Sequence, residues 1–198
     1  MKGVILAGGR GTRLQPLTTL FPKSLLPVYD KPMIFYPLDF LIRSGIKDIL
    51  IVIDYFHADM FMKYLHSGKE FGVNIQYKIQ DHPHGLPDAI YQARDFVGND
   101  SCLIVLGDNL AFDDVSSQVK EFASGASVFT KSVDDPSRFG VLYLDDKDAV
   151  SDMVEKPSAP KSDLAITGLY MFDNTVFEKI PSLNKSERGE FEIVDLLN

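Results

Sequence analysis

The stretch of sequence that decides the fold runs from Val4 to Leu14 and reads Val-Ile-Leu-Ala-Gly-Gly-Arg-Gly-Thr-Arg-Leu. Its first three residues are apolar and have the character of a short buried strand. Glycines follow at positions 8, 9 and 11, and this density allows the backbone to turn sharply and to bring its N–H groups close to a ligand. Because N–H groups gathered in this way commonly hold phosphate, the stretch predicts a strand that ends in a phosphate-binding loop.

Other glycine-rich loops fit this stretch less well. Leu14 stands where a dinucleotide-binding loop has its third glycine, and no Gly-Lys-Ser or Gly-Lys-Thr follows as in a Walker A loop. A tight strand-to-helix turn without a ligand remains the alternative at this point. Arg10 and Arg13 beside the glycines favour a ligand, because a turn has no need of a guanidinium group.

Apolar runs alternate with helical patterns up to about residue 125. The runs at 49–53 and 103–106 are continuously apolar, as in strands covered on both faces, and residues 73–77 also resemble a strand. Pro37 should kink the first helix or mark its first turn, and Gly45 is its stop signal. The alternation predicts an open α/β sheet. Helical spacing of apolar residues appears at 34–42, 89–96 and 115–122.

The pattern changes in the last part of the chain, where strand-like segments are separated by Asp, Pro and Gly turns. We therefore expect a mixed sheet in which later strands are added to a mainly parallel core. Residues 158–163 form a polar loop and not a linker, so that residues 1–198 are predicted to be a single domain. The strand-like segments are 127–130, 141–144, 150–155 and 165–172.

Composition excludes several classes of partner. The chain has 198 residues and a formal net charge of −8, so it lacks the excess of Lys and Arg that displaces counterions from nucleic acid. No apolar run is long enough to cross a bilayer, and Gly8 and Gly9 interrupt the first one, so that we expect neither a signal peptide nor a membrane partner. Cys102 is the only cysteine and lies in an apolar run, which predicts a buried thiol in the reducing cytoplasm.

A carboxylate follows the strand predicted at 103–106. Asp108 comes just past the carboxyl end of that strand, where ligands bind in open α/β sheets. Such a group suits Mg²⁺, which takes one or two carboxylates and completes its shell with water and phosphate oxygens. An aspartate that caps the next turn is the alternative. His82 and His84 are only weak evidence for zinc, and the lack of a Gly-x-Ser-x-Gly pattern argues against a side-chain nucleophile.

Seven motifs follow one another in an order that is specific to one family. They are Leu6-Ala-Gly-Gly-Arg-Gly-Thr-Arg-Leu14, Pro22-Lys-Ser-Leu-Leu-Pro27, Asp30-Lys-Pro-Met33, Val105-Leu-Gly-Asp-Asn109, Arg138-Phe-Gly140, Glu155-Lys-Pro157 and Thr167-Gly-Leu-Tyr170. Together they closely resemble the glucose-1-phosphate thymidylyltransferase family of sugar nucleotidyltransferases. The resemblance implies a Rossmann-like, mixed and mainly parallel sheet with helices on both faces. It also implies a nucleotide-binding half at about 1–125 and a sugar-binding half at about 126–198.

The resemblance implies a reaction as well. A nucleotidyl group passes from dTTP to glucose 1-phosphate, giving dTDP-glucose and pyrophosphate, with Mg²⁺ as the cofactor. The expected catalytic residues are Arg13 at the leaving pyrophosphate, Lys23 at the reacting phosphates and Asp108 at the metal. The expected nucleotide-binding residues are Leu6, Ala7, Gly8, Gly9, Gly11, Thr12, Arg13, Gln80 and Gly85. The expected sugar-phosphate-binding residues are Asn109, Gly140, Glu155, Lys156, Ile166, Thr167 and Tyr170.

Two departures from the family pattern bear on the base. Gln80 and Gly85 match the positions that read it, and a glutamine amide offers a donor and an acceptor to the imide edge of thymine or uracil. However, 87–89 read Pro-Asp-Ala where the family usually has Ala-Gln-Ala, and Ser24 replaces a glutamine common in the thymidylyl branch. A UTP-dependent sugar-1-phosphate uridylyltransferase is therefore the nearest alternative.

The sequence given ends at Asn198, in a segment that starts an internal helix in the family. A later segment of the family supplies a second aspartate to the metal, and without it we expect weaker metal binding, reduced turnover and retained nucleotide binding. A non-catalytic nucleotide-sugar-binding module is thus a second alternative. A dinucleotide-binding oxidoreductase is disfavoured by the missing third glycine and the missing acidic residue. The oligomeric state, a homo-oligomer included, stays open.

Overall fold

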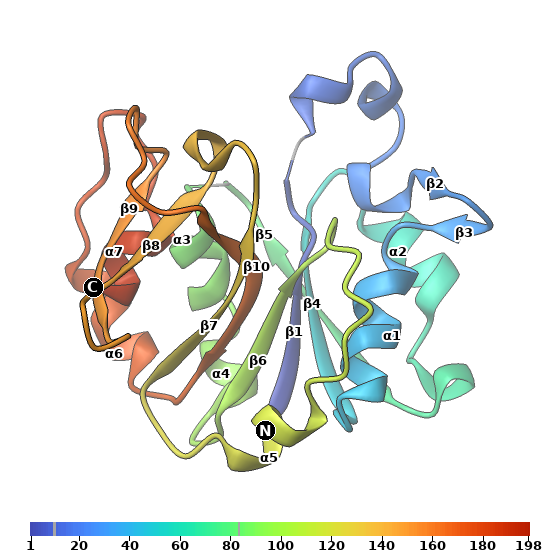
Figure 1. Cartoon of the computed structure of the whole chain (residues 1–198). Coiled ribbons are helices and arrows are strands. Elements are labelled where there is room, and N and C mark those ends of the chain that lie inside the picture. Colours follow the sequence, from blue (N-terminus) through green and yellow to red (C-terminus); the bar gives the residue numbers. More distant parts are fainter. Residues whose placement is uncertain (10, 83) are drawn as a thin grey trace.

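The computed structural model describes residues 1–9, 11–82 and 84–198. Its centre is one mixed eight-stranded sheet that runs through both halves of the chain (Figure 1). The strand order is β5-β4-β1-β6-β10-β8-β9, and β7 pairs with β10 off this path. The strands are β1 (Lys2–Leu6), β4 (Asp48–Asp54), β5 (Asn74–Gln80), β6 (Cys102–Leu106), β7 (Ala126–Ser132), β8 (Gly140–Leu144), β9 (Val150–Glu155) and β10 (Leu164–Phe172).

Four parallel strands form the core of this sheet. β1 pairs in parallel with β4 on one side and with β6 on the other, and β5 pairs in parallel with β4. β10 is antiparallel to β6, and β7 and β8 are antiparallel to β10. The predicted mixed sheet, with later strands added to a parallel core, is confirmed.

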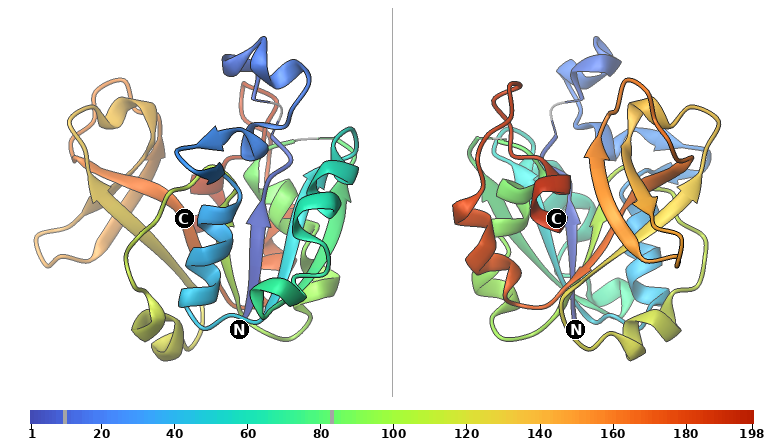
Figure 2. Two further views of the ribbon diagram at one scale, coloured as in Figure 1. Left: turned by 90° about the vertical axis from the view of Figure 1, so that its right-hand side faces the viewer. Right: turned by 60° about the vertical axis from the view of Figure 1, so that its left-hand side comes forward.

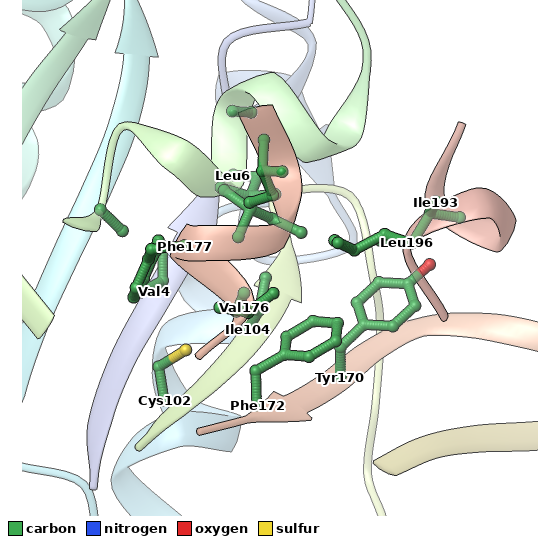
Figure 3. Close-up of a cluster of buried hydrophobic side chains, with 14 of the residues drawn as sticks. Val4, Leu6, Cys102, Ile104, Tyr170, Phe172, Val176, Phe177, Ile193 and Leu196 are labelled. Atoms are coloured by element: carbon green, nitrogen blue, oxygen red, sulfur yellow. The ribbon is translucent and has the colours of Figure 1, made fainter. Parts of the chain in front are cut away.

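Helices cover both faces of the parallel core (Figures 1 and 2). Alternate residues of β1 serve the two faces: Ile5 packs on the side of α1, whereas Val4 and Leu6 pack on the side of α3. Figure 3 shows the cluster of buried side chains on the side of α3, to which β6 contributes Ile104 and β10 contributes Tyr170. One face carries α1 (Phe35–Arg43), α2 (Ala58–Leu65) and α5 (Ser116–Glu121), and the other carries α3 (Leu86–Tyr91), α4 (Arg94–Val97), α6 (Val176–Lys179) and α7 (Ile193–Leu197).

One predicted helix is two short helices in the structure. The helical pattern at 89–96 belongs to α3 and α4, which are separated by a turn at Gln92 and Ala93. The N–H of Ala93 donates to the carbonyl of Ile90 at 2.9 Å, which tightens the backbone into a three-residue turn. Ala93 and Val97 are both fully buried, so the bend brings the two helices onto the same core. By contrast, α1 matches its prediction, and Pro37 lies in its first turn.

Short elements connect the larger ones, and several of them precede the first helix. The short 3₁₀ helices are Thr12–Leu14, Leu17–Thr19, Lys23–Leu25, Lys69–Phe71, Pro136–Arg138 and Ile180–Ser182, and a separate two-stranded sheet joins β2 (Pro27–Val28) to β3 (Lys31–Pro32).

Among the described residues, no helix has the length and apolar character that a membrane span needs.

The single cysteine is part of the core, as the sequence predicted. Cys102 begins β6, is fully buried and lies opposite Phe172 of β10 (Figure 3). Burial raises the pKa of its thiol to about 12, because the thiolate form is disfavoured away from water. The side chain therefore serves packing and is unreactive in the folded chain.

The segment 186–198 returns to the carboxyl end of the parallel strands. The N–H of Phe191 donates to the carbonyl of His84 at 2.8 Å, and Phe191 forms an isolated parallel bridge with Gly85. Gly85 has a φ of +106°, and a Cβ added to it would lie 2.2 Å from the carbonyl oxygen of Phe191. Only glycine permits this approach, so Gly85 fixes the segment against the loop that precedes α3.

An ion pair fastens the same segment internally. Arg188 Nη2 donates to Glu192 Oε2 at 2.5 Å, and Ser186 Oγ donates to Glu192 Oε1 at 2.6 Å. Burial by itself raises the pKa of Glu192, but these hydrogen bonds and the charges of Arg188 and Lys156 outweigh it and hold the pKa below its ordinary value. Folding therefore favours the carboxylate form of Glu192.

We expect this ion pair to make the fold less stable in acid. A carboxyl group with a pKa lowered by folding stabilises the native state above its ordinary pKa of 4.5, and the contribution is lost as the pH falls through the folded value. Glu192→Gln should lower the melting temperature at neutral pH and have a smaller effect at about pH 3, in thermal scans followed by circular dichroism. Glu187→Gln, at an exposed position, is the control. An equal loss at both pH values would contradict the expectation.

Candidate active site

The candidate site lies where the parallel strands end. The last residues of β1 and β6, Leu6 and Leu106, are paired, and the N–H of Gly107 donates to the carbonyl of Leu6 at 2.8 Å. The glycine loop and Asp108 therefore leave the sheet side by side. Gln80, the last residue of β5, ends on the same edge. This is the edge at which ligands bind in open α/β sheets.

A first cavity, of about 470 Å³, opens above this edge. Its walls bring together the residues that were expected to bind the nucleotide, with the exception of Arg13, and two of those expected to be catalytic, Lys23 and Asp108. The expected residues that line it are Leu6, Ala7, Gly8, Gly9, Gly11, Thr12, Gln80 and Gly85. Residues that the sequence did not assign to binding complete the wall: Ser24, Leu86, Ala89, Leu106 and Glu190.

The glycine loop closes into a 3₁₀ helix directly after Gly11. Gly11 has a φ of +60°, and its carbonyl accepts hydrogen bonds from the N–H of Leu14 at 2.9 Å and from Thr18 Oγ1 at 2.8 Å. A Cβ added to Gly11 would lie 2.9 Å from Thr18 Cγ2. Glycine is thus required both by the backbone conformation and by the close approach of Thr18. Arg10 lies outside the described residues.

A cation and a carboxylate meet beside the loop. Lys23 begins a 3₁₀ helix, and its Nζ donates to Oδ2 of Asp108; both side chains are about one third exposed, at 35% each. A further cavity of about 290 Å³ is lined by this pair together with Arg13 and Thr12. The three residues expected to be catalytic are therefore neighbours around one space.

Asp108 is suited to a divalent cation that arrives with other ligands. It is a partly exposed carboxylate at the wall of an open cavity, which fits Mg²⁺ whose remaining ligands are phosphate oxygens and water. The described part of the chain contains no group of three or more His, Cys, Asp or Glu side chains that could hold a metal ion by themselves. The donor set therefore fits a metal carried by the substrate better than a metal held in a protein cage.

A second cavity, of about 330 Å³, adjoins the first. Leu86, Leu106 and Glu190 line both of them, and Arg13 lines the second as well as the space around Lys23 and Asp108. Most of the residues expected to bind the sugar phosphate are here: Gly140, Glu155, Lys156, Ile166 and Tyr170. The remaining lining residues are Arg138, Phe139, Arg188, Phe191, Glu192 and Ile193.

Two cations lie together in the second cavity. Lys156 Nζ donates to Glu155 Oε1 at 2.6 Å, and Arg188 Nη2 approaches the same oxygen at 3.4 Å. Lys156 has a φ of +45°, unusual for a residue with a side chain, and its N–H donates to the carbonyl of Phe139 at 2.9 Å. Arg188 was not singled out in the sequence. It lies 32 residues after Lys156, so no local spacing could have linked them.

Three of the expected sugar-site residues differ in how they are placed. Tyr170 is 3% exposed, and burial, followed by the charge of Glu155, raises the pKa of its hydroxyl. Thr167 directs its hydroxyl to the carbonyl of Phe129 at 2.7 Å and does not line either cavity. Asn109 also lines neither cavity; its Nδ2 would lie 2.7 Å from a Cβ added to Gly168. Tyr170 thus forms part of a wall, whereas Thr167 ties β10 to β7 and Asn109 lies beside Gly168 of β10.

The known proteins that are similar in sequence to this chain are nucleotidyl transferases. A model of the nucleotidyl transferase family matches residues 2–198. Glucose-1-phosphate thymidylyltransferase of Neisseria meningitidis is 46% identical over 200 residues, and that of Mycolicibacterium smegmatis is 45% identical over 199 residues. Each match covers 99% of this chain and 69% of the relative.

Solved structures give the same result. A Bacillus anthracis protein assigned as a glucose-1-phosphate thymidylyltransferase, in complex with sucrose, is similar with a TM-score of 0.93 at 44% identity, over 99% of this chain and 80% of that one. A UDP-glucose pyrophosphorylase complexed with UDP-glucose is similar with a TM-score of 0.85 at 26% identity, over 99% and 84% of the two chains. With this match of fold and sequence, the chain belongs to the glucose-1-phosphate thymidylyltransferase family of nucleotidyl transferases.

Proposed function

We propose that the chain transfers a nucleotidyl group from dTTP to glucose 1-phosphate, giving dTDP-glucose and pyrophosphate. The observation that carries the proposal is the pair of adjoining cavities with Leu86, Leu106 and Glu190 in their common wall. The first cavity is lined by the glycine loop with Lys23, and the second by Lys156 with the guanidinium groups of three arginines. Two adjoining spaces that each carry cations suit two phosphate-bearing substrates that react with one another.

The first cavity would hold the triphosphate. The backbone of the glycine loop offers N–H groups to phosphate oxygens, and Lys23 adds a charge at the same wall. Arg13 lines the second cavity and the space around Lys23 and Asp108, which suits a role in neutralising the pyrophosphate as it leaves. The base would lie towards Gln80 and Gly85, which line the other part of the first cavity.

The second cavity would hold glucose 1-phosphate. Four cations line this cavity and are available to the phosphate group: Lys156, Arg188, Arg138 and Arg13. Glu155 accepts hydrogen bonds from Lys156 and Arg188 and offers its other carboxylate oxygen to a sugar hydroxyl. Tyr170 and Ile166 supply the apolar part of the wall on which a sugar ring can rest.

Mg²⁺ would be held by Asp108 together with phosphate oxygens and water. Bound there, it would neutralise charge on the triphosphate and polarise the phosphorus that is attacked. Lys23 donates a hydrogen bond to Asp108 Oδ2. When the metal arrives with its substrate, the Lys23 ammonium group would turn from this oxygen towards the phosphates, because two cations repel one another beside the same carboxylate.

The chemical step needs positioning and no side-chain nucleophile. An oxygen of the sugar phosphate forms a bond to the α-phosphorus while the bond to pyrophosphate breaks on the opposite side. Lys156 and Arg188 would hold the attacking group, and Arg13 and Lys23 would stabilise the negative charge that develops.

UTP is the second candidate for the nucleotide. Gln80 offers the same donor and acceptor to uracil and to thymine, and the similar UDP-glucose pyrophosphorylase structure was solved with UDP-glucose. The two bases differ by a methyl group and the two sugars by one hydroxyl. Ser24, which is 5% exposed and lines the first cavity, leaves more room than a glutamine there.

A panel of nucleotides tests the proposed reaction directly. The chain is incubated with glucose 1-phosphate, Mg²⁺ and dTTP, UTP or a purine triphosphate in turn, and pyrophosphate release is measured. We expect release with dTTP or UTP and little with the purines, because a purine is larger than the pyrimidine ring that would lie beside Gln80 and Gly85. Release without glucose 1-phosphate, or equal release with all nucleotides, would falsify the proposal.

Removal of the carboxylate charge tests the role of Asp108. Asp108→Asn keeps the size of the side chain and should lower turnover by about 100-fold or more, since charge neutralisation at the triphosphate is lost. Affinity for the triphosphate, measured by calorimetry without Mg²⁺, should not fall, because the substitution removes a negative charge from the cavity wall. Asp113→Asn, in the same connection between β6 and α5 and exposed, should keep full activity. Undiminished turnover of Asp108→Asn would remove Asp108 from the mechanism.

Removal of one cation tests the second cavity. Lys156→Met keeps most of the apolar stem and should raise the KM for glucose 1-phosphate by about tenfold, the effect of losing one charge-assisted hydrogen bond. The KM for the nucleotide should stay within about twofold, because Lys156 does not line the first cavity. Lys161→Met, at an exposed position, is the control. A rise confined to the KM for the nucleotide would show that the two cavities have been assigned the wrong way round.

A further inference from the structure

The side chain proposed to face the base is itself held by a carboxylate. Gln80 is 5% exposed, and its Nε2 donates to Asp88 Oδ2 at 2.5 Å. Asp88 lies in the first turn of α3, eight residues further along the chain. It stands where the family pattern given above usually has a glutamine, whose amide can donate or accept, whereas a carboxylate only accepts.

The contact fixes which end of the amide points which way. The two ends of a glutamine amide have nearly the same shape, and only their hydrogen-bond partners distinguish them. An ionised carboxylate accepts hydrogen bonds and cannot donate them. Turning the Gln80 amide over would place Oε1 against Asp88 Oδ2, two acceptors in contact, so the observed orientation is the favoured one.

The opposite end of the amide lies beside the glycine loop. A Cβ added to Gly8 would be 3.1 Å from Gln80 Oε1, and among residues 1–9, 11–82 and 84–198 no hydrogen bond to this oxygen is found. Nε2 keeps a second N–H that Asp88 does not use. The cavity is therefore offered an acceptor on the side of Gly8 and a donor on the side of Asp88, in that fixed order.

The backbone that carries Asp88 is held in place by packing and by a bridge to another segment. Pro87 precedes it in α3 and is buried, and Ile90 in the same helix is fully buried. Gly85, at the start of the helix, is bridged to Phe191. The backbone of the first turn of α3 is thus packed on the core and bridged to Phe191, which keeps Asp88 within hydrogen-bonding distance of Gln80.

We propose that Asp88 is a positioning residue that makes the site select thymine or uracil over cytosine. The imide edge of thymine and uracil has an N–H beside a carbonyl, which matches an acceptor followed by a donor. Cytosine reverses both groups at the same positions, with a ring nitrogen acceptor beside an amino donor. If cytosine bound in the same pose, its ring nitrogen would face Gln80 Oε1, which is also an acceptor, and its amino group would face the Nε2 donor. Asp88 prevents the Gln80 amide from turning over to remove these two repulsive contacts. The inference rests on the proposed function, since it takes a pyrimidine nucleoside triphosphate to be the ligand.

The test compares binding of four nucleotides to the full chain and to Asp88→Asn. Asparagine can donate or accept, so it tolerates both orientations of the Gln80 amide. Dissociation constants for dTTP, UTP, dCTP and CTP are measured by calorimetry with Mg²⁺. We expect the preference for dTTP and UTP over dCTP and CTP to fall by about tenfold, the factor of one hydrogen bond to a charged group, with an absolute gain in affinity for dCTP.

Two readouts separate positioning from a structural defect. A weakened fold lowers the affinity for all four nucleotides and for inorganic tripolyphosphate, whereas loss of positioning leaves tripolyphosphate binding and the melting temperature unchanged. Asp88→Ala removes the acceptor altogether and should change the preference in the same direction. Asp95→Asn, an exposed acid in the first turn of α4, is the matched control and should leave the preference as it is.

The outcomes also separate this inference from the proposed function. If the unaltered chain prefers dTTP and UTP, and Asp88→Asn and Asp88→Ala keep that preference, the role of Asp88 is overturned while the transferase reaction stands. If the unaltered chain binds all four nucleotides alike, or none of them, the role of Asp88 is overturned as well. Pyrophosphate release with glucose 1-phosphate then decides independently whether the transferase proposal stands.

Discussion

The parallel pairing of β1 with β6 is the constraint on which the rest of the site depends. It aligns Leu6 with Leu106 and ties Gly107 to the carbonyl of Leu6, so the glycine loop and Asp108 start from neighbouring points of one edge. A slip of one residue in this register would turn the side chains of β1 to the wrong faces, and Ile5 would leave the core that it shares with α1. The buried apolar side chains on both faces thus also fix the position of the polar groups at the edge. The register of β1 against β6 therefore determines both the packing of the core and the geometry of the site.

The segment that follows α6 completes what the parallel strands begin. Phe191 is bridged to Gly85, while Arg188 and Glu190 from the same segment face the cavities. This segment therefore connects the loop before α3, where the base is proposed to lie, with Lys156, where the sugar phosphate is proposed to lie. The ion pair between Arg188 and Glu192 keeps the segment in shape. This one segment therefore contacts both halves of the site through its backbone and also contributes side chains to both cavities.

Much of the fold could be predicted from the sequence, because buried parallel strands leave an unmistakable apolar run and glycine at a positive φ is replaced only at a cost. The break between α3 and α4 could not, since the residues around Ala93 keep a helical spacing of apolar side chains through the bend. Arg188 and the contact between Gln80 and Asp88 were also beyond reach. Both depend on how distant or differently folded segments come together, and an arginine or aspartate in a polar stretch is most often a solvated surface residue.

The burial of the single cysteine gives the molecule a built-in reporter of its own opening. The Cys102 thiol begins β6, the strand that leads to Asp108, and it is fully buried with a pKa of about 12. Its side chain packs with Val176 and Phe177 of α6, so a thiol-directed reagent can modify it only when this packing opens. The rate of labelling in native buffer thus measures the free energy of exposing this face of the sheet, without any substitution in the chain. A ligand that bridges the two halves of the site slows this labelling in proportion to how firmly it holds the sheet closed.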